Sequence, residues 1–144
     1  MKKSTRNIRY LVVHCSATPE GRDHTAKDIA LWHKQRGFNE IGYNYIVRLD
    51  GTVELGRDVN KIPAHVTNHN KDSIGICYIG GIDKNTLQPK DTRTPAQKEA
   101  LKKLLTELRA LYPEAEILGH RDFPGVAKAC PCFNAKDEYK TISK

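Results

Sequence analysis

The sequence predicts one domain of the α/β class, with a mixed central β-sheet flanked by helices. Short β-branched, apolar segments at residues 8–14, 73–79 and 116–118 have the pattern of buried strands. They alternate with two amphipathic helical stretches, which favours crossover connections and a sheet covered by helices. A hairpin pattern at residues 41–55 adds one antiparallel pair, so the sheet should be mixed.

Length and composition agree with a single globular domain spanning residues 1–144. Of the 144 residues, 38% are hydrophobic and 28% are charged, which excludes a disordered chain. No apolar run approaches the length of a membrane span or of a signal peptide, so we expect no membrane insertion. We therefore expect the chain to be cytoplasmic as synthesised.

The net charge of +7 comes partly from a basic N-terminal arm, residues 1–7. A basic balance suits polyanions such as nucleic acid, an acidic cell wall or anionic lipid. We expect instead a solvated surface and a frayed arm. We do not expect nucleic-acid binding, because the sequence has no basic groove with interleaved aromatic residues.

The four cysteines leave two arrangements open. Without a secretion signal, reduced thiols are favoured. Cys130 and Cys132 are too close in sequence to bridge without strain. Cys15 and Cys77 fall in predicted core strands, where a bridge between them is the alternative to two buried thiols.

Local signals set the ends of the two helices. Thr25 and Asp28 form a capping box that opens a helix reaching about Arg36, and Gly37 follows as the C-terminal signal. His33 on this helix is expected to be packed and hydrogen-bonded. The longer helix begins at Thr94-Pro95-Ala96-Gln97, continues through leucines at helical spacing, and ends before Pro113.

Between the helices, the hairpin and a long loop are expected. Asp50-Gly51 is the dipeptide typical of a type I′ turn. Residues 56–72 are polar and irregular, carry His65 and His69, and are long enough to suggest a binding loop. A final helical turn or two is expected from Ala135.

Three separated residues are candidate metal ligands. His120 and Cys130 lie on a loop, residues 119–133, and His14 ends the first strand. Because His14 and His120 each follow an apolar strand, both could emerge at one edge of the sheet. Three protein ligands with a fourth position open is the arrangement of a catalytic zinc site. Cys132 would close the site if it were a ligand, but we rank it as a bystander.

Two further residues suit hydrolysis at such a site. Lys128 could stabilise the oxyanion that develops on a carbonyl, and Tyr43 could orient water or transfer a proton. The combination suits cleavage of an amide or ester with one Zn²⁺ per chain. From spacing alone, a core histidine with free thiols remains an equal alternative.

Several motifs occur in one order along the chain, namely Val12-Val13-His14-Cys15-Ser16-Ala17-Thr18, Trp32-His33, Gly42-Tyr43-Asn44-Tyr45, Asp50-Gly51-Thr52-Val53, Ser73-Ile74-Gly75-Ile76, Thr94-Pro95-Ala96-Gln97 and Gly119-His120-Arg121-Asp122. Together they resemble a known family, the type 2, zinc-dependent N-acetylmuramoyl-L-alanine amidases. This family includes amidase-type phage lysozymes and animal peptidoglycan recognition proteins. Residues 80–83 and 128–131 resemble the phage lysozyme branch in particular.

The resemblance implies a peptidoglycan hydrolase that cuts the amide between N-acetylmuramic acid and L-alanine of the stem peptide. It implies zinc ligands at His14, His120 and Cys130, a catalytic tyrosine at Tyr43 and an oxyanion-assisting residue at Lys128. His65 matches a loop histidine facing the substrate groove. Peptidoglycan or muropeptides would be the substrate, and a phage or prophage endolysin would reach the wall after release or export by another factor.

Two alternatives to a simple hydrolase remain. Some family members recognise peptidoglycan without cutting it, and these typically lack the cysteine ligand that Cys130 would provide here. Phage lysozymes of this branch can also bind a phage RNA polymerase, so a polymerase partner is possible by family analogy only.

Overall fold

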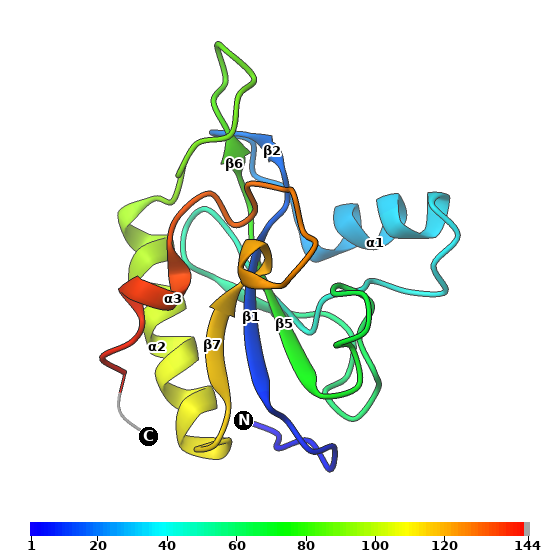
Figure 1. The fold of residues 1–144 in the computed structure, drawn as a ribbon. Helices are drawn as coiled ribbons and strands as arrows, with labels where there is room; N and C mark the ends of the chain where they lie inside the picture. Colours follow the sequence, from blue (N-terminus) through cyan, green and yellow to red (C-terminus); the bar gives the residue numbers. More distant parts are fainter. Residues whose placement is uncertain (143–144) are drawn as a thin grey trace.

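The computed structural model describes residues 1–142 and confirms the mixed sheet flanked by helices (Figure 1). The five-stranded sheet has the order β4-β3-β5-β1-β7. Neighbours are parallel except for the antiparallel hairpin of β3 and β4. The strands are β1 (Tyr10–Cys15), β3 (Tyr45–Val47), β4 (Val53–Leu55), β5 (Ser73–Tyr78) and β7 (Glu116–Gly119). Parallel strands place their carboxyl ends at one edge of the sheet.

The helices begin where their caps predict. Thr25 caps α1 (Ala26–Gln35), and Thr94 caps α2 (Pro95–Leu111), each through a complete capping box. A single turn, α3 (Ala135–Glu138), confirms the helical tail, and a 3-10 turn, η1 (His120–Asp122), follows β7. No helix within residues 1–142 is long and apolar enough to cross a membrane.

The two faces of the sheet are covered by different helices. The leucines of α2 pack with Leu11, Val13 and Ile76 in the main core, which also includes Ala135 of α3. Ile29 of α1 packs with Ile46 and with Cys77 and Ile79 on the opposite face. Figure 1 shows α2 and α3 to the left of the sheet and α1 to the right. Successive side chains of a strand point to opposite faces, so His14 and its neighbour Cys15 belong to different surroundings.

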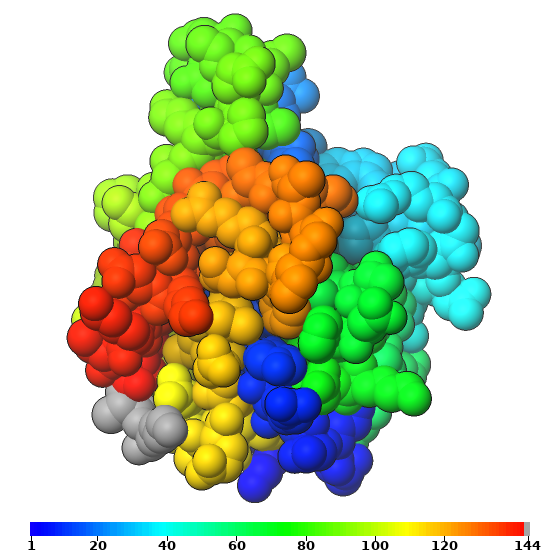
Figure 2. Space-filling view, in the orientation of Figure 1, coloured from blue at the N-terminus to red at the C-terminus, as the bar shows by residue number. Residues whose placement is uncertain are grey.

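A short parallel pair, β2 (Thr18–Pro19) and β6 (Gly81–Ile82), was not expected from the sequence. The segment that follows β6 projects from the body of the molecule at the top of Figure 2. Strands β2 and β6 contain two residues each, which is too few for a periodic sequence pattern to reveal them.

The N-terminal arm, which was expected to fray, makes specific contacts with the body of the protein. The Ser4 amide donates a 2.6 Å hydrogen bond to the Tyr112 hydroxyl, and Lys2 pairs with Asp58 at 2.8 Å. The Arg6 guanidinium donates to four backbone carbonyls, among them those of Val59 and Ser73. Figure 2 shows this blue segment packed against its neighbours. Its basic residues satisfy carbonyl and carboxylate oxygens of the loop at residues 56–72, which charge counting alone cannot reveal.

The hairpin is confirmed, but the type I′ turn was wrong. Gly51 has a φ of +87°, whereas Asp50 is not among the residues with positive φ. The Gly51 amide donates to the carbonyl of Arg48, and the Asp50 carboxylate accepts from the Thr52 amide at 2.9 Å. Asp50 therefore stabilises the turn through its side chain, without the left-handed backbone that a type I′ turn requires there.

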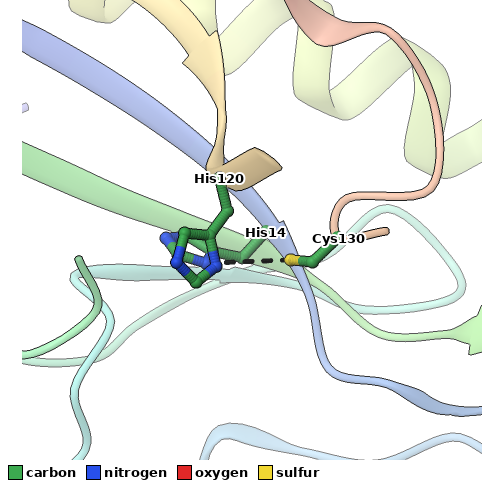
Figure 3. Close-up of side chains that lie close together, drawn as sticks. All are labelled: His14, His120 and Cys130. Carbon is green, nitrogen blue, oxygen red and sulfur yellow. Dashed lines mark hydrogen bonds between the residues drawn. The ribbon is translucent and has the colours of Figure 1, made fainter. Parts of the chain in front are cut away.

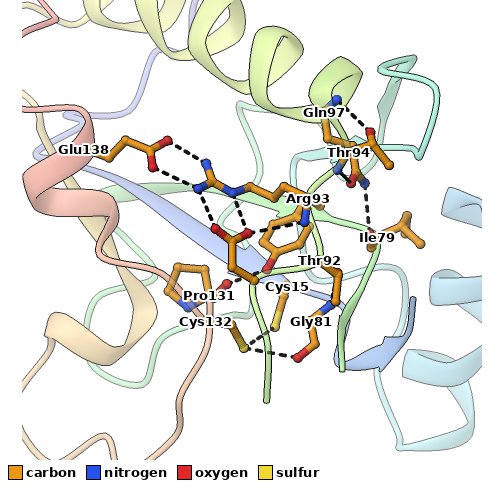
Figure 4. A network of polar contacts seen from close by, with 12 residues as sticks. Cys15, Ile79, Gly81, Thr92, Arg93, Thr94, Gln97, Pro131, Cys132 and Glu138 are labelled. Atoms are coloured by element: carbon orange, nitrogen blue, oxygen red, sulfur yellow. Dashed lines mark hydrogen bonds and ion pairs between the residues drawn. The ribbon is translucent and has the colours of Figure 1, made fainter. Parts of the chain in front are cut away.

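All four cysteines are free thiols, so the alternative of a Cys15–Cys77 bridge was wrong. Cys77 packs on the α1 face, whereas Cys15 packs on the α2 face. The Cys15 Sγ lies 3.8 Å from the Cys132 Sγ (Figure 4). Side chains on opposite faces of adjacent strands cannot approach closely enough for a disulfide.

Candidate metal centre and active-site cleft

His14 and His120 are brought together by the register of two parallel strands. Val13 of β1 is paired with Gly119 of β7, and each histidine is the next residue in its chain segment. Their rings lie 4.6 Å apart between centroids. The prediction that both emerge at one edge of the sheet is confirmed.

Cys130 lies at this same edge because hydrogen bonds hold its loop there. The Arg121 amide donates to the carbonyl of Cys130 at 2.9 Å, and the Tyr78 hydroxyl donates to that of Pro131 at 2.6 Å. The Cys15 amide donates to the Cys130 Sγ at 3.2 Å. The sulfur is therefore held by the end of β1 itself.

An ionic network centred on the buried Arg93 side chain fixes the segment that follows Cys130 (Figure 4). The Arg93 side chain is only 2% exposed and pairs with Asp91 and Glu138 at 2.9 and 2.6 Å. Its guanidinium also lies 3.4 Å from the centre of the Phe133 ring. These carboxylates hold the pKa of Arg93 above its ordinary value despite its burial, which itself lowers that pKa. The network ties α3 to the segment before α2 and so stabilises the approach to the cysteine loop.

The three candidate ligands converge in space (Figure 3). One ligand atom from each of His14, His120 and Cys130 lies within 4.8 Å of the others. The Cys130 Sγ is 3.8 Å from the His14 Nδ1. Tetrahedral zinc, with bonds of about 2.3 Å to sulfur and 2.0 Å to nitrogen, separates such atoms by about 3.6 Å. Two imidazoles and a thiol at this spacing fit a zinc ion.

The surroundings keep the two histidines neutral. Burial lowers the pKa of His14 well below its ordinary value, and the charge of Lys128 contributes in the same direction. Burial and Lys128 likewise lower the pKa of His120. A metal binds the neutral imidazole, so these shifts favour coordination over protonation near neutral pH.

All six residues proposed from the sequence line one cleft of about 650 Å³. The Tyr43 ring lies 4.9 Å from the His14 ring, between centroids, and burial raises the pKa of Tyr43 well above its usual value. Lys128 is exposed on the cleft's surface. The cleft thus offers a protonated phenol and an ammonium group beside the candidate metal centre.

His65 occupies a different position from the one expected of a residue that only faces substrate. It lines the cleft, but its Nδ1 lies 2.7 Å from the His14 Nε2 and its Nε2 lies 2.7 Å from the Ser73 Oγ. Burial, together with the charges of His120, Arg6 and Arg57, lowers the pKa of His65 to about 3. The contact with a candidate ligand could not be read from the sequence, since no spacing links residues 14, 65 and 73.

The remaining candidates have other surroundings. The Cys132 Sγ is 3.3 Å from the Gly81 carbonyl oxygen, and Cys132 is not part of the ligand cluster found among the described residues. His33 accepts a 2.8 Å hydrogen bond from the Gly42 amide, as the packed-histidine interpretation predicted. His69 packs against Tyr10 and Phe123.

A second hollow of about 510 Å³ lies between the N-terminus, the β3–β4 hairpin and α2. Within residues 1–142, none of the six candidate residues lines this hollow. The chemistry of the site therefore belongs to the cleft at the carboxyl ends of β1 and β7, which is where ligands of parallel sheets commonly bind.

Comparison with known proteins gives a consistent result. The family model described as N-acetylmuramoyl-L-alanine amidase matches residues 4–133. The chain is 44% identical to the endolysin of Enterobacteria phage K11, covering 90% of this chain and 83% of that protein. It is 40% identical to the endolysin of Escherichia phage T7, covering 93% of this chain and 87% of that protein.

Solved structures share the fold. The N-acetylmuramoyl-L-alanine amidase LysC from Clostridium intestinale has a TM-score of 0.77 at 27% identity, covering 100% of this chain and 95% of that one. A Y78F mutant of Drosophila PGRP-LB in complex with tracheal cytotoxin has a TM-score of 0.74 at 27% identity, covering 97% of this chain and 84% of that one. The chain belongs to the N-acetylmuramoyl-L-alanine amidase family, as its motifs, fold and ligand cluster indicate.

Proposed function

We propose that this protein is a zinc-dependent endolysin that hydrolyses the amide between N-acetylmuramic acid and L-alanine of the peptidoglycan stem peptide. The observation that carries the proposal is the cluster of two imidazoles and one thiol in a cleft. Three protein donors leave one position of a tetrahedral ion for water or substrate, as in catalytic zinc sites. The similarity to phage endolysins over most of both chains supports the biological role.

The roles of the ligands follow from this assignment. His14, His120 and Cys130 would hold the ion, with the Cys15 amide stabilising the negative charge on sulfur. When bound, zinc supplies Lewis acidity and an activated water at neutral pH. The neutral state of both histidines and the fixed position of the thiol mean that little reorganisation precedes metal binding.

Two cleft residues act on the amide itself. Lys128 places a positive charge where the carbonyl oxygen of the scissile amide becomes negative, which stabilises the transition state. Tyr43 stays protonated because its pKa is raised, so its hydroxyl can donate a hydrogen bond to the reacting groups and deliver a proton to them. The cleft would accept peptidoglycan or a muropeptide as the substrate.

Recognition without cleavage is the rival function within this family. Peptidoglycan recognition proteins are among the relatives, at 35% identity for the SC2 protein of Drosophila simulans. The complete set of Cys130, Tyr43 and Lys128 in one cleft favours catalysis. The polymerase role implied by the family resemblance stays a prediction.

Product analysis on purified peptidoglycan tests the proposal. The zinc-loaded protein should release fragments with new L-alanine amino termini and without new reducing sugar ends. Binding to sedimented wall without new amino termini would contradict the proposal and identify a recognition module. New reducing ends in place of amino termini would indicate cleavage of the glycan and would also contradict it.

A further inference from the structure

We propose that His65 is a positioning residue that holds His14 in the tautomer able to bind a metal through Nδ1. This inference rests on the proposed zinc function and deepens it. It replaces the substrate-binding role expected for His65 with a contact to a metal ligand. Ser73 is also part of this arrangement, because its hydroxyl contacts the His65 Nε2 and so orients the His65 ring.

The two ring nitrogens of His14 have different neighbours. Its Nδ1 faces the Cys130 Sγ at 3.8 Å, which is the side of the candidate ion. Its Nε2 lies 2.7 Å from the His65 Nδ1. A metal on Nδ1 requires the lone pair there, so the proton of neutral His14 must reside on Nε2. That N–H can then donate to His65.

The same reasoning fixes the proton of His65. Its Nδ1 must accept from His14, so its own proton lies on Nε2 and is donated to the Ser73 Oγ at 2.7 Å. The chain His14–His65–Ser73 therefore has one proton arrangement compatible with a metal on His14 Nδ1. Reversing the His65 tautomer would point two N–H groups at each other across 2.7 Å.

The backbone holds His65 in place without help from a metal. The Asn70 Oδ1 accepts from the amides of His65 and Val66, both at 2.9 Å, which locks the loop at this point. Gly75 of β5 lies under the ring, and a Cβ at Gly75 would come within 3.0 Å of the His65 Nδ1. Loop and strand thus leave a fitted space for the imidazole above the sheet.

Ser73 is held equally firmly. It is fully buried at the start of β5, and its carbonyl accepts from the Arg6 guanidinium at 3.0 Å. Arg6 of the N-terminal arm thereby helps to hold Ser73, the hydrogen-bond partner of His65, in place. Because both nitrogens of His65 have partners inside the protein, neither is free to bind substrate.

A matched pair of variants tests the role. Asn and Leu are close in size and shape, but only His65→Asn keeps an acceptor near the position of Nδ1. Zinc affinity is measured by competition with a chromophoric chelator, alongside kcat and KM on peptidoglycan. His65→Leu should bind zinc about 10- to 100-fold more weakly than the wild type, as is typical when a partner of a metal ligand is lost. His65→Asn should lie closer to the wild type.

A second readout does not depend on the loaded enzyme. Ring ¹⁵N shifts in NMR spectra of the metal-free protein report which nitrogen of His14 carries the proton. The wild type and His65→Asn should show it on Nε2, and His65→Leu should show a mixture. Ser73→Ala, which removes the partner of His65 Nε2, should give a smaller loss of zinc affinity, and it provides the test if His65→Leu does not fold.

The outcomes separate this inference from the proposed function. If His65→Leu binds zinc as tightly as the wild type and His14 keeps its tautomer, the positioning role is wrong even though the wild type cleaves peptidoglycan. A rise in KM alone in His65→Leu would also overturn it and restore a substrate-binding role. If the wild type binds no zinc, the proposed function fails, and a changed His14 tautomer in metal-free His65→Leu would still support the positioning contact.

Discussion

The amide of Cys15 donates a 3.2 Å hydrogen bond to the Sγ of Cys130, and this bond joins the end of β1 to the loop that carries the third candidate ligand. His14 precedes Cys15, so two successive residues of one strand contribute to the same candidate metal centre, one by its side chain and the other by its backbone. The donor is a backbone group, and substitution of the Cys15 side chain does not remove it. A hydrogen bond to a ligating sulfur stabilises its thiolate form.

Tyr43→Phe should abolish most activity while leaving zinc binding intact. The phenyl ring can keep its packing 4.9 Å from the His14 ring, but the hydroxyl that we propose as the proton donor is lost. Loss of a general acid or base typically lowers the rate by about 10²- to 10⁴-fold. The measurements are kcat/KM on peptidoglycan and zinc content. Tyr10→Phe is the matched control, because Tyr10 packs against Phe123 and should tolerate the change. Equal activity in Tyr43→Phe and the wild type would refute the role.

Lys128→Gln should lower kcat by about 10²- to 10³-fold, the usual effect of removing one oxyanion-stabilising group. It should also raise the pKa of His14 and His120, because the Lys128 charge lowers both. Protons would then compete with zinc at higher pH, so the midpoint of zinc binding against pH should move upward. Lys136→Gln on α3 is the control, since Lys136 is exposed there. An unchanged kcat together with an unchanged midpoint would contradict the assignment.

Cys132→Ala should keep both zinc and activity. The Cys132 Sγ lies near the Cys15 Sγ and the Gly81 carbonyl, on the α2 face of the sheet. The thiol is therefore a packing group beside the site. Zinc content by atomic emission, with kcat/KM, measures the effect. Loss of zinc in this variant would mean that Cys132 closes the site as a fourth ligand, which would count against catalysis.

His33 should make the metal-free protein less stable in acid. Burial and the charges of Arg36 and Arg57 lower the pKa of His33 below its ordinary value of 6.5. Below pH 6.5 the unfolded chain takes up a proton that the folded chain does not, so the stabilisation present above pH 6.5 is lost as pH falls toward the lowered folded-state pKa. One such group contributes a slope of at most about 1.4 kcal/mol per pH unit.

Urea unfolding of the chelator-treated protein between pH 7.5 and pH 5 measures this slope. His33→Gln should show a shallower fall in the free energy of unfolding than the wild type. The absolute stability of the variant should be lower at every pH, because the Gly42 amide loses its 2.8 Å acceptor. Identical slopes in the two proteins would show that His33 does not contribute.

Much of the fold could be predicted because its signals are local. Thr25 and Thr94 mark helix starts through contacts three residues away, and apolar periodicity marks the central strands. The convergence of His14 and His120 was also predictable, since each follows a strand and parallel strands end together. Side-chain chemistry nominated Cys130, Tyr43 and Lys128, the family resemblance implied the same three residues, and all of them line the cleft.

What the sequence did not reveal depends on contacts between distant residues. Ser4 of the N-terminal arm finds its partner 108 positions away at Tyr112, a contact that the charge of the arm does not reveal. The contact between His14 and His65 spans 51 positions and needs Gly75 to be small. Such contacts leave no periodic pattern, because each depends on the final arrangement of loop and sheet.

Zinc content and amidase activity, measured together for the wild type and Cys130→Ala, test the central claim most directly. Cys132→Ala serves as the matched cysteine control. The account predicts about one zinc per chain and release of L-alanine amino termini in the wild type and in the control, from a three-ligand site. Both should be lost in Cys130→Ala with the fold retained by circular dichroism. A folded wild type that cleaves peptidoglycan without zinc, or a Cys130→Ala variant that keeps both properties, would contradict it.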